Sequence, residues 1–204
     1  MAIAQALLDE LWDFADPTGS EARLRHAADD RTDPEERAEL TTQVARAVGL
    51  QGRFADAHAV LDAVTITDDV VAARAALERG RLHNSAGDAE RATAYFLAAA
   101  DAASVAGSVF LRVDALHMLA IADADQSEEW TAAALSALDD VADPRTLRWR
   151  VSLHNNSGWA HFDAGHFADA LASFERAKDA AIRWGTPQQV VWADEAIAEA
   201  RARL

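Results

Sequence analysis

The chain has 204 residues, half of them hydrophobic, so a single domain or a short array of repeats can bury a core. Fifty positions are alanine, against only 4 prolines and 9 glycines, and this composition favours closely packed helices over a β-rich fold. The net charge of −15 disfavours binding to nucleic acids and to anionic membranes. With no cysteine, disulfides, thiolate catalysis and cysteine-ligated metals are excluded.

The first residues do not have the pattern of a secretory signal. The segment MAIAQALLDELWDF lacks a basic start and carries Asp9 and Glu10 early. No apolar run approaches the length of a membrane span. We therefore expect a cytoplasmic protein.

Apolar periodicity and helix-ending residues predict a succession of helices. These cover residues 2–15, 20–29, 34–50, 53–63, 69–85, 88–105, 108–124, 127–140, 144–163, 167–184 and 187–203. All four prolines fall at predicted helix boundaries, where a missing N–H costs nothing. Asp33, Asp143 and Thr186 each precede such a proline and are expected to cap the helix that follows.

A repeat with a period of 35 to 40 residues runs along these helices. It is marked by an alanine in each unit: Ala22, Ala57, Ala92, Ala132 and Ala170. In three units a glycine precedes the alanine by five residues, namely Gly52, Gly87 and Gly165. In the same units a large apolar residue follows four residues later, namely Leu61, Phe96 and Phe174.

This spacing predicts a helical hairpin. The glycine permits the positive φ that ends the first helix, and the alanine lets the second helix approach closely. The large residue four positions later lies on the same helix face and fills the space between the helices. On the first helix, a small residue at Ala45, Gly80 or Gly158 is expected to meet it.

The pattern resembles the tetratricopeptide repeat, a helix–turn–helix unit of 34 residues. Residues 156–158 (Asn-Ser-Gly) stand where that family usually has Asn-Leu-Gly, and Gly165, Ala170 and Phe174 follow at the family's spacing. The resemblance implies an all-α fold, a right-handed superhelix (α-solenoid) of about five antiparallel helix pairs. It divides the chain into a degenerate N-terminal helical pair (1–33), four repeat-like units (34–185) and a C-terminal capping helix (186–204).

In this family, ligands contact the first helices of the units, which line a concave groove. Carried over position by position, the resemblance implies a binding face made of Gln43, Arg46, Arg74, Glu78, Arg81, Asn84, Asp114, His117, Asn155, Asn156, Trp159 and Phe162. Arginines with asparagines suit carboxylates and backbone carbonyls, and Trp159 with Phe162 suits an apolar side chain. A structural interpretation stays open for each, since Arg74 and Arg81 can pair with Glu78 and Trp159 can pack against the next helix.

We therefore expect a non-catalytic module that binds a protein or an extended peptide. No phosphate-binding loop, nucleophile–base pair or metal-ligand motif is present, so no enzyme activity, cofactor or metal is expected. A second hypothesis is a sensor of a small anionic ligand or short signalling peptide, held by Arg74, Arg81, His117 and Asn155. A third is a scaffold that self-associates as a homo-oligomer, for instance through Trp192.

Overall fold

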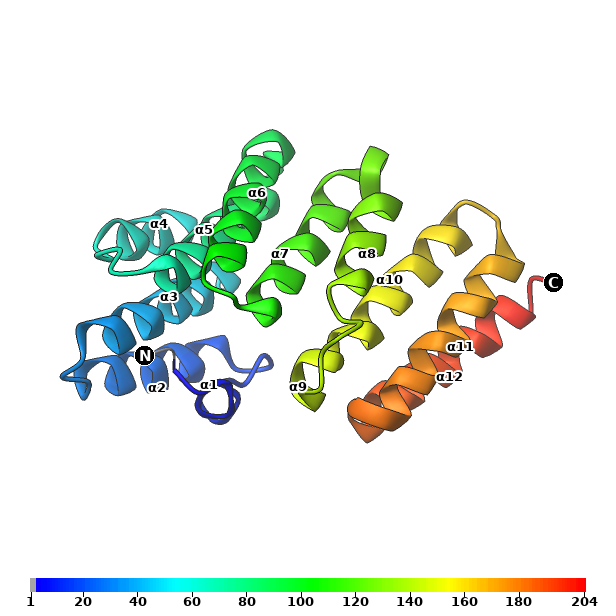
Figure 1. The fold of residues 1–204 in the computed structure, drawn as a ribbon, viewed down its shortest axis with the longest axis horizontal. Helices are drawn as coiled ribbons and strands as arrows, with labels where there is room; N and C mark the ends of the chain where they lie inside the picture. The colour runs from blue at the N-terminus through cyan, green and yellow to red at the C-terminus, as the bar shows by residue number, and fades with distance from the viewer. Residues whose placement is uncertain (1–2) are drawn as a thin grey trace. The chain divides into compact units, whose positions relative to one another are not determined.

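A computed structural model describes residues 3–204, which are helical or lie in the turns between helices (Figure 1). They contain no strand, so the predicted all-α class is confirmed. The helices divide after Asp123 into two compact units, residues 1–123 and 124–204. In each unit successive helices pack against their neighbours in a solenoid-like arrangement.

The first unit contains seven helices in its described part. They are α1 (Gln5–Leu11), α2 (Pro17–Asp29), α3 (Pro34–Leu50), α4 (Phe54–Asp62), α5 (Asp69–Ser85), α6 (Ala89–Val105) and α7 (Val109–Ala122). From α2 to α7 each helix packs against the next, and α5 also packs against both α3 and α7. Helices α3, α5 and α7 thus lie side by side as one layer, with α4 and α6 packed behind it.

The second unit begins with a short 3₁₀ turn, η1 (Ala124–Gln126). Its helices are α8 (Ser127–Ser136), α9 (Pro144–Leu147), α10 (Trp149–Asp163), α11 (Phe167–Trp184) and α12 (Pro187–Arg201). Helices α10 and α11 form a hairpin, α12 packs against both of them, and α8 packs against α10. Helix α12 therefore covers this hairpin.

All four prolines occupy the first turn of a helix, and the predicted starts at Pro34, Pro144 and Pro187 are confirmed. The helix predicted from residue 20 begins earlier, at Pro17. Asp33 and Asp143 accept backbone N–H groups of the helices they cap, and Thr186 forms a reciprocal capping box with Gln189. The helices expected over 2–15 and 127–140 end earlier, at Leu11 and Ser136, and the helix expected over 144–163 is divided at Arg148. There the Val151 N–H donates to the Arg148 carbonyl three residues back, a tighter turn than α-helix.

The predicted hairpin packing is also present. A β-carbon built at Gly80 would lie 2.4 Å from a ring atom of Phe96, and one at Gly158 would lie 2.4 Å from Phe174. Both rings are fully buried, as are the marker alanines of the same hairpins. Gly52, Gly87 and Gly165 have positive φ, as the repeat spacing predicted. None of the helices in residues 3–204 has the length and apolar character needed to cross a membrane.

Candidate functional site

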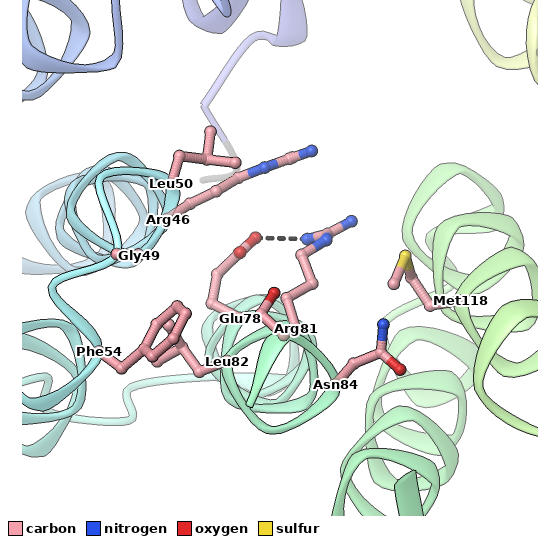
Figure 2. Close-up of a pocket in the computed structure, with 11 residues that line it drawn as sticks. Arg46, Gly49, Leu50, Phe54, Glu78, Arg81, Leu82, Asn84 and Met118 are labelled. Atoms are coloured by element: carbon pink, nitrogen blue, oxygen red, sulfur yellow. Dashed lines mark hydrogen bonds and ion pairs between the residues drawn. The ribbon is translucent and has the colours of Figure 1, made fainter. Parts of the chain in front are cut away.

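A cavity of about 330 Å³ opens in the first unit beside the layer formed by α3, α5 and α7 (Figure 2). Its walls come from α3, the turn into α4, α5 and one residue of α7. The lining residues are Arg46, Gly49, Leu50, Gly52, Phe54, Glu78, Arg81, Leu82, Asn84, Ser85 and Met118. Four of the predicted binding residues, Arg46, Glu78, Arg81 and Asn84, therefore line one cavity.

Arg81 links two buried carboxylates at the cavity wall. Its Nη1 donates to Glu78 Oε1 at 2.5 Å, and its Nη2 donates to Asp114 Oδ1 on α7 at 2.5 Å. Burial alone would raise the pKa of Asp114, but the guanidinium of Arg81, with help from Arg46, lowers it below the ordinary value. Arg81 therefore holds α5 to α7 through an ion pair and has few donors left for a ligand.

Arg74 and Gln43, two further predicted residues, are buried and bonded within the protein. Arg74 Nε donates to Glu39 Oε2 at 2.9 Å, and its Nη2 donates to Gln5 of α1 at 3.3 Å. Burial raises the pKa of Glu39, against the opposing effect of Arg74. Gln43 accepts a hydrogen bond from the indole N–H of Trp12 at 3.3 Å. The expected pairing of Arg74 with Glu78 is replaced by the pair with Glu39 from the neighbouring helix.

Arg46 lies against aromatic rings instead of an acid. Its guanidinium carbon is 5.6 Å from the ring centre of Trp12 and 5.3 Å from that of Phe14, and these two rings stack on each other. Burial lowers the pKa of Arg46, and the nearby charge of Arg81 lowers it further. Trp12 and Phe14 were not among the predicted site residues. The one feature of the sequence that could have pointed to them is the presence of two aromatic residues between a short apolar stretch and Pro17.

His117, on α7, was predicted to take part in binding a ligand. It is half-buried, and desolvation lowers its pKa, with Asp114 opposing and Arg81 reinforcing that effect. The lowered pKa favours the neutral imidazole at pH 7.

The remaining predicted residues lie on α10, in the second unit. Asn155 and Asn156 are half-buried there. The Trp159 ring makes edge contacts with Phe162 and Phe174, at 5.4 and 5.0 Å between ring centres. Trp159 and Phe162 also pack against a buried cluster that includes Ile197 of α12. This is the packing interpretation that the sequence left open for Trp159.

A second hollow, of about 400 Å³, lies in the second unit beside α10 and α11. Arg150, Arg176 and Arg183 line it together with His154. Burial, with the charges of Arg176 and Arg150, lowers the pKa of His154 to about 4. Arg150 is paired with Asp139 at 3.1 Å, so part of the positive charge here is neutralised.

Two further observations bear on the kind of site. In residues 3–204, no three histidine, aspartate or glutamate side chains are grouped so that they could hold a metal ion. No protein-family model matches the chain, and no curated protein is significantly similar to it.

Proposed function

We propose that the protein is a non-catalytic binding module that holds a short peptide segment of a partner protein in the cavity of the first unit. The observation that carries this proposal is the cavity itself, lined by Arg46 and Leu50 of α3, by Phe54 at the start of α4, and by Glu78 and Asn84 of α5. Polar groups that fix an orientation beside an apolar wall are the usual content of a binding pocket. The resemblance of the helix spacing to tetratricopeptide repeats supports the same proposal by analogy.

The test is a selection of random twelve-residue peptides displayed on phage against the immobilised chain, followed by affinity measurement on the synthetic peptides recovered. We expect Leu50→Glu and Arg46→Ala to weaken the binding of recovered peptides at least tenfold. Leu50 is 52% exposed and Arg46 has no ion pair within residues 3–204, so neither change leaves a buried charge unpaired. Binding by both variants as tight as that of the unaltered chain would remove the cavity as the site.

Two variants of the same unit serve as matched controls. Val105→Glu is the control for Leu50→Glu, because Val105 is 74% exposed at the end of α6 and lies outside the cavity. Arg112→Ala is the control for Arg46→Ala, because Arg112 is exposed on α7. Both controls should bind the recovered peptides like the unaltered chain. Failure to enrich any peptide above an empty support would contradict the proposed function.

A small ligand is the second candidate, because about 330 Å³ falls within the size range of small-molecule pockets. The structure changes which residues would hold such a ligand. Arg74 and Arg81 are already bonded to buried carboxylates, so Arg46 is the arginine in the cavity wall with donors to offer. A thermal-shift screen separates the candidates, since a ligand at 100 times its Kd stabilises by about 2.7 kcal/mol.

A further inference from the structure

Glu78 carries a buried oxygen with no hydrogen-bond donor. Its side chain is 2% exposed, and Oε1 accepts from Arg81, but Oε2 receives no hydrogen bond from any residue in 3–204. Buried carboxylate oxygens are nearly always bonded, because an unsatisfied one loses its hydration without replacement. Glu78 also lines the cavity, so a ligand N–H that displaces the atoms covering this oxygen would supply its missing hydrogen bond.

Arg46 provides the complementary feature on the facing helix. Its guanidinium has five N–H donors, yet in the described chain it lies against the Trp12 and Phe14 rings and donates to no carboxylate. Figure 2 shows the Arg46 and Glu78 side chains projecting from α3 and α5 toward the same space, with a dashed line from Glu78 to Arg81 only. A ligand between them meets a donor from one helix and an acceptor from the other.

The charges around this space cancel. Arg46 and Arg81 contribute two positive charges, and Glu78 and Asp114 contribute two negative charges. An anion brought to Arg46 would also lie near the carboxylates, and a cation brought to Glu78 would lie near both guanidiniums. Because charge interactions are strong in a partly desolvated cavity, an uncharged group with both a donor and an acceptor suits it best.

We propose that the bound peptide inserts a primary carboxamide, the side chain of glutamine, between Arg46 and Glu78. Its amide N–H donates to Glu78 Oε2, and its carbonyl oxygen accepts from the Arg46 guanidinium. A side-chain carboxamide carries both groups at one planar end, whereas a trans backbone amide points them in opposite directions. The methylenes of the glutamine then lie against Leu50, Phe54 and Leu82 of the same cavity.

This arrangement predicts strong discrimination between similar side chains. Glutamate lacks the N–H donor and places a negative charge next to Glu78, while lysine lacks the acceptor and adds a positive charge next to Arg46. Each leaves a buried polar group unpaired, which sites built on hydrogen bonds reject strongly. The inference rests on the proposed peptide-binding function and names the side chain that enters the cavity.

The test uses three probes with identical backbones, each closed by an N-methylamide so that the glutamine side chain is the one primary carboxamide: N-acetyl-glutamine N-methylamide, N-acetyl-glutamate N-methylamide and N-acetyl-lysine N-methylamide. Each is titrated at pH 7 into the full ¹⁵N-labelled chain and followed by ¹H–¹⁵N NMR. We expect the glutamine probe to shift the backbone amides of Gly49 and of residues 78–85, with a Kd at least tenfold lower than that of either other probe. Arg46→Ala should remove this preference, and Arg112→Ala should keep it.

Three results would overturn the inference. Equal or tighter binding of the glutamate probe makes the cavity an anion site on Arg46, and equal or tighter binding of the lysine probe makes it a cation site on Glu78. Absence of shifts with all three probes shows that the cavity takes no such side chain. Peptides that compete at the cavity but contain no glutamine would likewise overturn it, and would leave the proposed function standing.

Discussion

The ring of Phe96 in α6 lies directly over the α-carbon of Gly80 in α5, so closely that a β-carbon at residue 80 would be 2.4 Å from the ring. The ring is fully buried and cannot turn into solvent. Gly158 and Phe174 repeat the relationship between α10 and α11. The distance between paired helices is thus set by the absence of a side chain on one helix and a ring on the other.

Gly80→Ala should therefore destabilise the protein although alanine favours helix. Overpacking of a buried contact costs about 1–3 kcal/mol, which exceeds the gain of about 1 kcal/mol from replacing a helical glycine. Urea denaturation followed by circular dichroism measures the free energy of unfolding. The second variant, Phe96→Leu, leaves a cavity that the new methyl group fills in the double variant. The double variant should lose clearly less than the sum of the two single losses, and simple additivity would contradict the proposed contact.

Much of this fold was predictable because its signals are local. Pro34 and Pro187 are tolerated in the first turn of a helix but not in its interior, and Asp33 and Thr186 supply the cap one residue earlier. The pairing of Gly80 with Phe96 follows from a spacing that recurs in Gly158 and Phe174. The division at Arg148 was not predictable, because no proline or glycine marks it.

Arg81 and Arg46 line the same cavity, but the loss of Arg81 should destabilise the protein much more than the loss of Arg46. Arg81→Ala removes the partner of both Glu78 and Asp114 and leaves two buried carboxylates unpaired, at a cost of about 3–5 kcal/mol. Arg46→Ala removes only contacts with aromatic rings, worth about 0.5–1 kcal/mol each. Urea denaturation of both variants at pH 7 makes the comparison. Similar losses for the two would contradict the assignment of Arg81 as the structural ion pair.

The candidate site was less predictable than the fold, because contacts between distant segments decide which of its side chains are already bonded within the protein. Projection onto the first helices placed Arg46, Arg81 and Glu78 on one face. It gave no way to know that Arg81 is occupied by Asp114, 33 residues later, or that Arg46 is not paired. Glu39 was missed because nothing in its local sequence distinguishes a buried acid from an exposed one.

His154 makes the stability of the second unit sensitive to mild acid. Its pKa falls from the ordinary 6.5 to about 4 on folding, because it is partly buried near Arg176 and Arg150. Between these values the unfolded chain binds more protons than the folded one, so stability is full above pH 6.5 and is lost as the pH falls toward 4. His154 is partly exposed, and solvent screening reduces the expected loss at pH 5 to about 1 kcal/mol.

Titration of the His154 imidazole by NMR measures this directly, with the His154→Asn spectrum assigning the signal. The expected midpoint lies near pH 4, and Arg176→Ala should move it upward because one of the neighbouring positive charges is removed. A midpoint near 6.5 in the unaltered chain would contradict the placement of His154 beside the two arginines. The stability of His154→Asn should vary less between pH 7 and pH 5 than that of the unaltered chain.

Phe14 is expected to act on the cavity through Arg46, although it does not line the cavity itself. Its ring holds the Arg46 guanidinium at 5.3 Å together with Trp12, and this keeps Arg46 away from Glu78. In Phe14→Ala the guanidinium is freed to bond Glu78 Oε2, and the two groups offered to a ligand are then lost to each other. Phe14 is 61% exposed, so the change should cost less than about 1 kcal/mol of stability.

We expect peptides recovered on the unaltered chain to bind Phe14→Ala about tenfold more weakly, and the Arg46 Nε–Hε signal to move as the guanidinium leaves the rings. Ile66→Ala, an exposed apolar change elsewhere in the unit, should alter neither. An unmoved Arg46 signal would show that Trp12 alone positions it, and a moved signal with unchanged peptide affinity would show that the position of Arg46 does not control binding.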